Sequence, residues 1–548
     1  MKALILSLIA TTVSIAATEA PVSKLVNLAA DGAAVAAPYN DKGDRLPDFS
    51  HAGYGGGGVP LPQVPVAITL SPAPGDNRAR IQAALDSLAA RAPDAEGWRG
   101  ALWLRRGHYA VEGTLFIRNS GVVLRGEGSG EDGTVLVATK AEKHNLIEAG
   151  GTGQWQERKE SSVEITDDYV PVGAAELNVA GAGRFHPGDR VIVQRASNAR
   201  WIAAIGMDHI PPRPDGRVVY QWQPGAMDLM FDRRIVAVEG NRLVLDVPLA
   251  NAFQREFGGG RVYRYDFPGR LEHIGVEHLR CVSRFDPAVR EDAREGPVFL
   301  RGERVDEDHA WNAVVFDAVE DAWARDVVSV AFANACVMSG RTAGRVTVAG
   351  CAALDPVSRL TGDRRYAFPI SGQLVLVRDC YARKARHAFV LDSRVPGPNV
   401  YLDCRAEENY STSEPHHRWA AGGLWDNVSV EGPGAWLSAV NRGWMGTGHG
   451  WAGAQMVFWN CSAALITVLQ PPTAQNFAVG ITRTWSQPKL VAAGVREADS
   501  TARTGYPPSA PFWGDGYRES EVGPVAPRSL YQAQLKARMR KAPPAMHE

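Results

Sequence analysis

The chain carries no surplus of charge of either sign. Its 59 Lys and Arg residues are balanced by 60 Asp and Glu residues, which gives a formal net charge of −1. A protein that binds nucleic acid through bulk charge needs a basic surplus. Beyond its first residues the chain also lacks any run of about 18 apolar residues, the length of a membrane span. The sequence therefore predicts neither a nucleic-acid partner nor a transmembrane segment.

Cysteine is scarce, and several familiar site signatures are missing. Six Cys in 548 residues are few for a secreted fold held together by disulfides. The sequence shows no zinc-ligand spacing, phosphate-binding glycine loop or Ser-His-Asp signature. With 45% hydrophobic residues, 56 Gly and 35 Pro, the composition predicts a soluble, turn-rich globular protein with a large core. It does not indicate an oligomeric state.

The N-terminus has the pattern of a secretory signal. Lys2 precedes the apolar run Ala3–Ile15, which is followed by the small residues Ala16 and Ala17. This order of charge, apolar run and small residues is typical of a signal peptide with a cleavage site. We therefore predict a signal peptide over residues 1–17 and a mature protein that is secreted or periplasmic.

Four segments in the second half of the chain share one pattern. Each is a short alternating strand ending in Asp, Asn or Gly, then Cys, then a small residue one or two positions on. Their cysteines are Cys351, Cys380, Cys404 and Cys461, and Leu424–Val428 fits the pattern without a Cys. The spacing varies around about two dozen residues, the length of one coil of a parallel β-solenoid. These cysteines are expected to stack inward as small hydrophobic side chains, one per coil, rather than to form disulfides.

The remaining segments complete a plan for the chain. Asp76 can cap an amphipathic helix that presents Ile81, Leu85 and Leu88 on one face. Between residues 151 and 272 the rhythm changes to antiparallel strands, one pair turning at Gly240-Asn241. The predicted organisation after the signal peptide is an N-terminal segment with the cap helix and first coils (18–150), a β-rich insertion (151–272), the main parallel β-helix with the candidate groove (273–470), and a C-terminal tail with a capping helix (471–548).

Several short motifs accompany the cysteine repeats. They are residues 47–54, 75–82, Arg386-His387, and residues 397–400, 415–419 and 446–451. In these motifs the chain resembles the secreted right-handed parallel β-helix proteins of the pectate-lyase superfamily. The resemblance spans most of the mature chain and implies an all-β, right-handed parallel β-helix. Relatives in this superfamily include polysaccharide lyases, glycoside hydrolases and uronate epimerases, so the resemblance is specific for fold and weak for substrate.

Arg and His residues recur after each repeat and are the candidate site. Equivalent positions on adjacent coils lie about 4.8 Å apart, so these residues are expected to form one ladder along a groove. Solvated or ion-paired arginines are the plainer alternative, because Asp363, Glu414 and Asp426 lie close in sequence. The members of the ladder are Arg364, Arg365, Arg386, His387, His416, His417, Arg418, Arg442, His449 and Gln470.

Aromatic residues near these positions add a second signal. Trp and Tyr faces offer an apolar platform to sugar rings in a polar groove. Trp419, Trp444 and Trp451 are set in loops beside His and Arg and are the candidates for ligand contact, whereas Trp425 and Trp459 lie on strands and fit the core.

The leading hypothesis is a polysaccharide lyase acting on an acidic, uronic-acid-containing glycan. β-Elimination needs a cation for the carboxylate, a base for the adjacent C–H and an acid for the leaving oxygen. Lysine is nearly excluded as the base, because residues 160–488 contain only Lys384. We expect His417 as the base, Arg418 and Arg386 as carboxylate clamps, and His387 or His449 as partner. His416, Arg442, Arg365 and the three loop tryptophans complete the expected substrate-binding set.

Two other functions stay open. A glycoside hydrolase on the same fold would need two carboxyl groups across the scissile bond. Asp306, Glu307 and Asp308 form the densest acidic run and could supply them or hold Ca²⁺, and Glu414 and Asp426 stand near the histidines in sequence. No cofactor is certain. The third alternative is a non-catalytic glycan-binding solenoid such as an adhesin.

Overall fold

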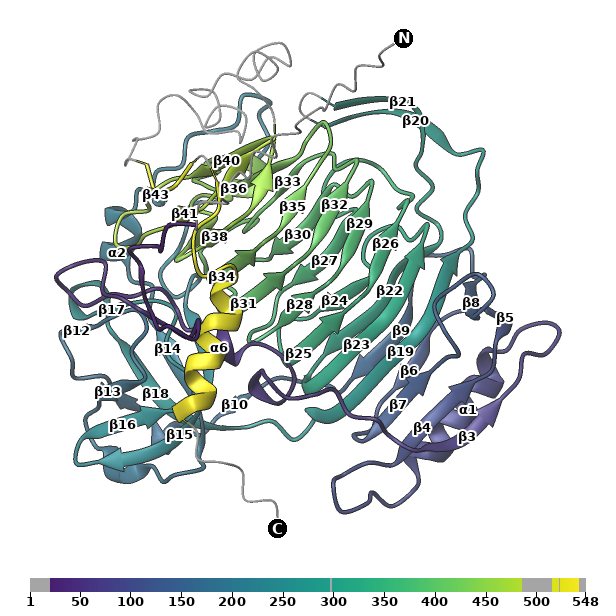
Figure 1. The fold of residues 1–548 in the computed structure, drawn as a ribbon, viewed down its shortest axis with the longest axis horizontal. Helices are drawn as coiled ribbons and strands as arrows, with labels where there is room; N and C mark the ends of the chain where they lie inside the picture. Colours follow the sequence, from purple (N-terminus) through teal and green to yellow (C-terminus); the bar gives the residue numbers. More distant parts are fainter. Residues whose placement is uncertain (1–19, 296–297, 485–514, 522, 542–548) are drawn as a thin grey trace, which may run out of the picture.

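The computed structural model describes residues 20–295, 298–484, 515–521 and 523–541. The predicted signal peptide lies outside these residues. Parallel strands stack along one long axis in three columns, so that the chain winds as a solenoid (Figure 1). The first column contains β3 (Val66–Leu70), β4 (Gly100–Leu104), β7 (Val122–Arg125), β19 (Leu271–Ser283), β23 (Val319–Val330), β25 (Gly344–Ala349), β28 (Leu376–Arg378), β31 (Pro396–Leu402), β34 (Ala420–Asp426), β37 (Gly453–Ala454), β38 (Val457–Trp459), β41 (Phe477–Val479) and β43 (Tyr517–Glu519).

The second and third columns complete each coil. Strands β19 and β23 are long enough to serve the first and second columns together. The second column adds β5 (Gly107–Val111), β8 (Thr134–Ala138), β26 (Ala352–Leu354), β29 (Tyr381–Arg383), β32 (Arg405–Glu407), β35 (Ser429–Val430), β39 (Ser462–Ala463) and β42 (Thr482–Arg483). The third column consists of β6 (Leu115–Ile117), β9 (His144–Gly150), β22 (Ala310–Asp317), β24 (Val337–Ser339), β27 (Tyr366–Ile370) and β30 (His387–Leu391), followed by β33 (Thr412–Ser413), β36 (Trp436–Ala439) and β40 (Leu465–Val468).

The cysteine repeats mark equivalent points of successive coils. Ala352 pairs with Tyr381, Tyr381 with Arg405, Arg405 with Ser429 and Ser429 with Ser462, each in parallel register. The residues just before these positions therefore stack, and they are Cys351, Cys380, Cys404, Val428 and Cys461. All six cysteines are free and buried, which confirms the predicted inward stack.

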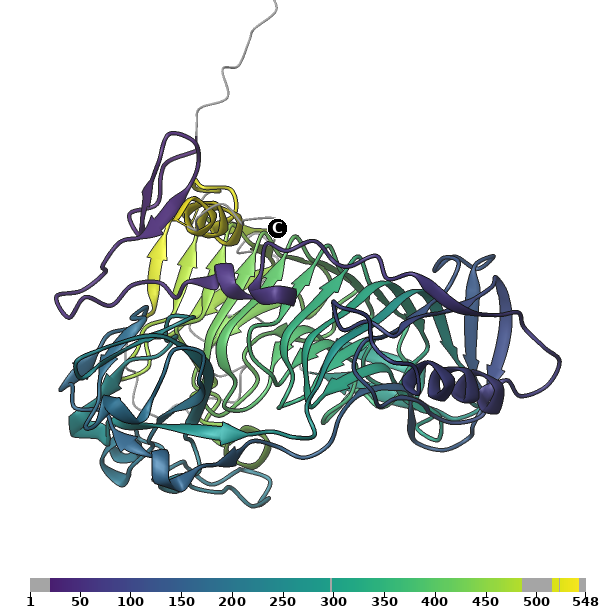
Figure 2. The same ribbon diagram turned by 90° about the horizontal axis from the view of Figure 1, so that it is seen from below.

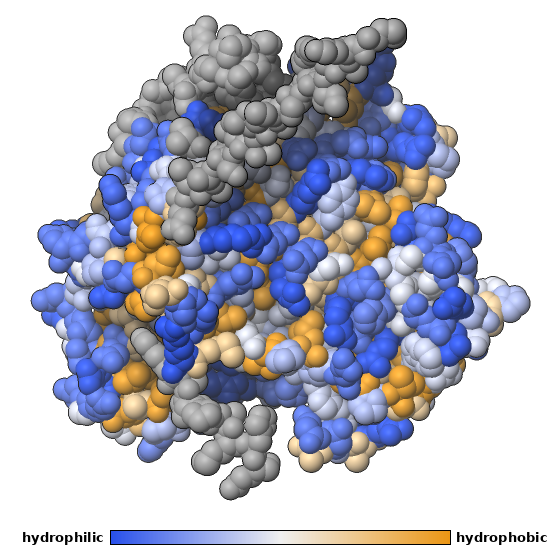
Figure 3. Space-filling model, in the orientation of Figure 1, coloured by the Kyte–Doolittle hydropathy of each residue, from blue (hydrophilic) through white to orange (hydrophobic). Residues whose placement is uncertain are grey.

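Two helices cover different parts of the solenoid. Helix α1 (Arg78–Ala89) packs Ile81, Leu85 and Leu88 into the same core as the first coils. The Asp76 carboxylate accepts a hydrogen bond from the Arg78 backbone N–H at 3.0 Å, as expected of a helix start. Helix α6 (Leu530–Lys541) lies across the first column near the C-terminal coils (Figure 1). Figure 3 shows the face that carries α6, where hydrophilic side chains are interrupted by scattered hydrophobic patches.

The N-terminal segment runs along the outside of the coils. Its strands β1 (Val26–Leu28) and β2 (Ala34–Ala36) pair antiparallel, and the short helices η1 (Phe49–His51) and η2 (Tyr54–Gly56) follow. Tyr531 on α6 donates a hydrogen bond to the Ala52 carbonyl at 3.1 Å, so the N-terminal segment and the C-terminal helix meet here.

The insertion forms a separate antiparallel lobe beside the C-terminal coils (Figure 2). Strands β15 and β16 are joined by the predicted turn at Gly240-Asn241. The short α3 (Met445–Gly448) of the β-helix lies against this lobe. Outside the lobe, β20 (Arg290–Glu295) and β21 (Val298–Arg304) pair antiparallel and pack against Leu360 and Tyr410. The lobe contains β10 (Gln156–Glu157), η3 (Lys159–Ser161), β11 (Val163–Glu164), β12 (Tyr169–Val170), β13 (Glu176–Asn178), η4 (Ala182–Arg184), β14 (Arg190–Arg195), α2 (Ala199–Ala204), β15 (Leu229–Glu239), β16 (Arg242–Leu245), β17 (Phe253–Gln254), η5 (Arg255–Phe257) and β18 (Gly260–Asp266).

The predicted fold class, an all-β right-handed parallel β-helix with a β-rich insertion and terminal helices, is confirmed. Within the described part of the chain, none of the helices is long and apolar enough to cross a bilayer.

Candidate functional site

A groove of about 700 Å³ runs over the outer face of the third column. Its lining comes from five strands of the six-stranded sheet β6-β9-β22-β24-β27-β30, from Thr114 just before the sixth strand β6, and from connecting segments that include the one after β33. Because neighbouring strands lie about 4.8 Å apart, five steps across this sheet span about 24 Å. The groove is therefore long enough to hold several sugar rings of an extended chain.

Histidines from different coils meet at the C-terminal end of this groove. The ring centroids of His387 and His416 are 4.8 Å apart, those of His416 and His417 are 5.2 Å apart, and those of His417 and His449 are 4.8 Å apart. The structure thus brings together all four histidines of the predicted ladder. Of these four histidines, only His416 and His417 line the groove itself.

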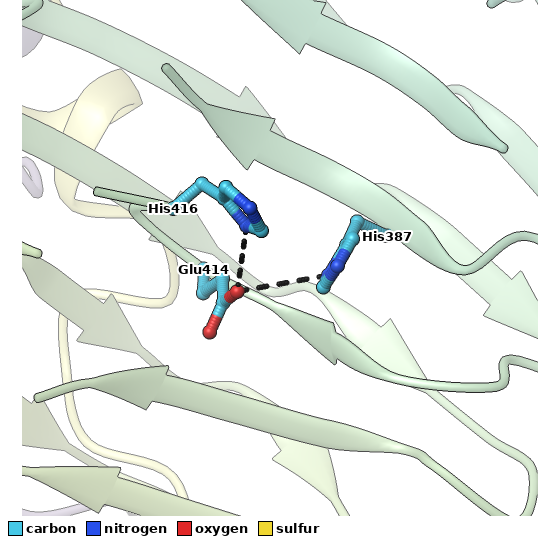
Figure 4. A group of neighbouring side chains, drawn as sticks. All are labelled: His387, Glu414 and His416. Atoms are coloured by element: carbon cyan, nitrogen blue, oxygen red, sulfur yellow. Dashed lines mark hydrogen bonds and ion pairs between the residues drawn. The ribbon is translucent and has the colours of Figure 1, made fainter. Parts of the chain in front are cut away.

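A buried ion pair between Arg442 and Glu414 lies behind these rings. Arg442 Nη1 lies 2.7 Å from Glu414 Oε1 and 2.8 Å from His416 Nδ1. His416 Nδ1 and His387 Nδ1 lie 3.0 and 3.7 Å from the same carboxylate oxygen (Figure 4). Ser438 donates to the other oxygen at 3.2 Å. Burial raises the pKa of Glu414, whereas the nearby Arg442 acts in the opposite direction.

Two neighbours of opposite character contact the Nδ1 atom of His416. Arg442 Nη1, which can only donate, lies 2.8 Å away, and the Glu414 carboxylate, which can only accept, lies 3.0 Å away. These two contacts favour opposite tautomers of the neutral ring. On the other side of the ring, Nε2 and the Tyr366 hydroxyl share a hydrogen bond of 3.0 Å, and Arg386 Nη1 approaches the same hydroxyl oxygen at 3.5 Å.

The pKa values of two groups that line the groove, Tyr366 and His417, are shifted in opposite directions. Burial raises the pKa of the Tyr366 hydroxyl, although Arg386 lowers it. Burial lowers the pKa of His417 to about 4, although Asp392, with its Oδ1 3.5 Å from Nε2, acts in the opposite direction. At neutral pH the structure therefore presents a protonated phenol and a neutral imidazole to the same space.

The other three histidines of the cluster, His387, His416 and His449, are neutral as well. Burial, followed by the charge of Arg442, lowers the pKa of His416 and of His449, and burial with Arg386 lowers the pKa of His387. Each ring can thus pass on or orient a proton without adding charge to the wall.

The trio His387, Glu414 and His416 has the composition of a metal site, since its ligand atoms lie within 4.8 Å of one another. Arg442 Nη1, however, already lies within 2.8 Å of two of those atoms. A guanidinium therefore supplies the positive charge at the centre of the trio, and the donor set does not favour a metal ion.

Several predicted ligands bind protein groups instead of the groove. Arg365 donates to the Ser358 carbonyl at 2.5 Å and pairs with Glu303 at 3.1 Å, away from the histidines. Arg386 pairs with Glu295 at 3.0 Å and donates to the Gly362 carbonyl at 2.6 Å. Arg418 donates to the Thr447 hydroxyl at 2.6 Å. Arg386 is thus buried and paired with Glu295, which does not favour direct binding of a substrate carboxylate. Arg418 is half-buried with one hydrogen bond, and its role as a carboxylate ligand stays a prediction.

The tryptophan expectation is corrected too. Trp419 and Trp451 are fully buried, and both belong to the apolar cluster of the insertion. Trp419 packs edge-on against Trp201 at 4.8 Å, and Trp451 donates to the Ile205 carbonyl at 3.1 Å. Trp444 is half-buried beneath Arg213. The buried rings of Trp419 and Trp451 anchor the insertion and offer no free face to a sugar, whereas contact of Trp444 with a ligand stays a prediction. Trp425 and Trp459 are buried on their strands, as expected.

The acidic residues weighed for hydrolysis or calcium are dispersed. Asp306 accepts backbone N–H groups of Asp286 and Asp308, and Glu307 pairs with Arg364. These protein donors satisfy the run, which does not favour a Ca²⁺ site. Asp426 lies beneath α6, where it accepts hydrogen bonds from the Ser529 hydroxyl and the Tyr531 N–H. Of the five acidic residues that the sequence suggested for hydrolysis or calcium, only Glu414 stands beside the histidines.

Sequence reasoning missed the residues that the third column contributes. The connection after most second-column strands contains a third strand, which the sequence pattern did not predict. Its outward positions supply Tyr366, Asp392 and Asn312 to the groove, and Trp311 stands at its far end. The one available signal was the repeated spacing itself, since Tyr366 pairs directly with His387 on the next coil.

No family model and no curated protein sequence matches this chain. Solved structures with a similar fold include the tailspike protein gp49 from Pseudomonas phage LKA1, at 13% identity and TM-score 0.39, over 74% of this chain and 63% of that one. An iota-carrageenase complexed to iota-carrageenan fragments matches at 7% identity and TM-score 0.31, over 70% of this chain and 57% of that one. PfbA, a surface adhesin of Streptococcus pneumoniae, matches at 8% identity and TM-score 0.32, over 76% of this chain and 84% of that one.

This chain spans less than two thirds of the length of the LKA1 tailspike and of the carrageenase. With TM-scores below 0.5, these similarities identify neither an activity nor a substrate for this chain. Membership of the pectate-lyase superfamily stays a prediction.

Proposed function

We propose that this protein is a secreted polysaccharide lyase that cleaves a uronic-acid-containing glycan by β-elimination in the third-column groove. The observation that carries the proposal is the pair of Tyr366 and His417. The two groups line one groove, and burial shifts their pKa values in opposite directions, that of the phenol upward and that of the imidazole downward.

The pair matches the two proton transfers of the reaction. His417, neutral at pH 7, takes the proton from the carbon next to the uronate carboxylate, and a carbon–carbon double bond forms as the glycosidic C–O bond breaks. Tyr366 gives its proton to the leaving oxygen. Asp392, 3.5 Å from His417 Nε2, stabilises the imidazolium that results. The two roles need groups of opposite protonation state in the resting enzyme, which is the state that burial favours.

Arg386 and Arg442 lie behind Tyr366 and His416 and act on the proposed centre through these two side chains. Arg386 approaches the Tyr366 oxygen at 3.5 Å, and Arg442 contacts His416, which in turn holds Tyr366. We therefore assign them the stabilisation of negative charge that develops on the phenol and the substrate, rather than bidentate binding of the carboxylate.

A second candidate, a glycoside hydrolase, is favoured by one observation. Glu148, Asp363 and Asp392 line the same groove, and hydrolysis requires two carboxyl groups. Glu148 is paired with Arg118 at 2.7 Å, which leaves Asp363 and Asp392 as the carboxyl groups for that reaction.

Product chemistry tests the proposal. Purified protein should convert a member of a polyuronate panel into unsaturated products that absorb in the ultraviolet, whereas hydrolysis yields reducing ends without that absorbance. Tyr366→Phe and His417→Ala should each lower kcat by about 10²–10⁴-fold. Reducing ends without absorbance, abolished by Asp392→Asn, would replace the lyase with the hydrolase.

Matched controls come from the opposite side of the coil. The Tyr381 hydroxyl bonds Glu407 on the second column, and His186 is exposed on the insertion. Tyr381→Phe and His186→Gln should leave turnover unchanged. Binding of a polyuronate with neither product would identify a non-catalytic solenoid and overturn the proposal.

A further inference from the structure

An unpaired lysine lies at the end of the groove opposite the histidines. Lys143 is exposed just before β9, and its Nζ lies 3.6 Å from the ring centroid of Trp311 on β22. Within the described residues it forms no ion pair, whereas the nearby Lys140 pairs with Glu142 at 2.8 Å. Apart from histidines, Lys143 is the one basic side chain in the lining of the groove.

Amide groups continue from this lysine toward the proposed centre. Asn312 Nδ2 donates to Asn145 Oδ1 at 2.8 Å, and Asn334 Nδ2 donates to Asn312 Oδ1 at 2.9 Å. Asn334 Oδ1 then accepts the Tyr366 backbone N–H at 2.9 Å. Asn312 and Asn334 each use one of their two amide N–H groups in this ladder, and Asn145 uses one to bond Glu148 at 3.0 Å, so each amide keeps a second N–H group for a ligand.

The lysine is too far from Tyr366 to act in the same subsite. The order β9-β22-β24-β27 places three strand steps, about 14 Å, between the coil of Lys143 and the coil of Tyr366. That distance exceeds one sugar ring. A group bound at Lys143 must therefore belong to a different residue of the glycan from the one that reacts.

We propose that Lys143 and Trp311 form a remote subsite that binds the carboxylate of a uronic acid residue several positions from the scissile bond. The ammonium provides a charge-assisted contact to the carboxylate, and the Trp311 ring, over which the Lys143 Nζ lies, provides an apolar edge to the same sugar. Neighbouring acids do not neutralise the lysine, since Glu148 is held by Arg118 at 2.7 Å and Glu142 by Lys140. This subsite rests on the proposed function for its ligand, but not on the reaction that follows.

Binding measured against chain length tests the subsite. Titration calorimetry on the His417→Ala variant, with oligouronates from dimer to hexamer, measures affinity without turnover. Affinity should rise stepwise once the oligomer is long enough to reach Lys143. Lys143→Met should remove that step and weaken binding of the hexamer about tenfold while leaving the dimer unchanged, and Lys140→Met should bind like the parent.

The nature of the contact sets a second readout. Hexamers whose carboxyl groups are reduced to alcohols should bind the parent and Lys143→Met equally, and added salt should weaken the hexamer more in the parent than in the variant. Equal affinity of parent and Lys143→Met at every length, or an equal loss for dimer and hexamer, would overturn the subsite alone. Failure of every oligouronate to bind the parent would overturn the proposed function together with the subsite.

Discussion

Replacing Arg442 with Met should strongly destabilise the protein, because it leaves a buried carboxylate without its cation. The side chains of Arg442 and Glu414 are 5% and 1% exposed, and their closest atoms are 2.7 Å apart. Breaking such a buried pair on one side costs about 3–5 kcal/mol of unfolding free energy. The Ser438 hydroxyl, 3.2 Å from Glu414, offsets little of this loss because it is a single neutral donor.

The double variant Arg442→Met/Glu414→Gln separates charge from packing. Removing both charges leaves a neutral amide that Ser438 can still contact, so most of the lost stability should return. Denaturant unfolding followed by circular dichroism measures both variants. Arg378→Met, which breaks an exposed pair with Asp379, is the matched control and should cost less than about 1 kcal/mol. A loss below about 1 kcal/mol for Arg442→Met, or a double variant no more stable than the single one, would refute this reasoning.

Three further outcomes are expected. Histidines of the unfolded chain take up a proton near pH 6.5, whereas in the folded protein the pKa of His417 is about 4 and the pKa values of His416 and His449 are also lowered. Stability should therefore fall as the pH drops from about 6.5 to 4, and less steeply in His417→Gln, which melting curves can measure. Glu320→Gln should cost about 3 kcal/mol in denaturant unfolding, since Glu320 on β23 meets Arg190 and Arg234 of the insertion at 2.6 and 3.1 Å, whereas exposed Glu239→Gln should cost little. Reductant should leave the melting temperature unchanged, because all six cysteines are free.

The fold could be predicted because the core of a β-helix repeats. Each coil places a small apolar side chain at the same inward point, and Cys351, Cys380 and Cys404 satisfy that demand in register. Repetition of the core is a physical requirement of stacking, so it leaves a period in the sequence. The histidine cluster followed from counting along that period.

The groove could not be predicted in the same way. Its outward residues face solvent or a ligand, so stacking places no demand on them and no period results. Tyr366, which contacts His416, therefore gave no signal of its own, and only its place in register with His387 on the next coil could have indicated it. The tryptophans gave a misleading signal for a related reason. Trp419 and Trp451 are large and apolar because a second lobe packs on them, which the sequence of the coils alone does not reveal.

The insertion and the histidine cluster belong to one mechanical unit. The segment that carries His449 is held by three contacts from the insertion: Arg213 donates to the Gly446 carbonyl at 2.8 Å, the Tyr220 N–H to the Thr447 carbonyl at 3.0 Å, and Trp222 Nε1 to the Gly448 carbonyl at 3.3 Å. His449 in turn packs against His417. A side chain that transfers a proton must be held within a fraction of an ångström. We therefore expect the buried Trp222, Trp419 and Trp451 to position the histidines of the proposed centre rather than to contact the glycan.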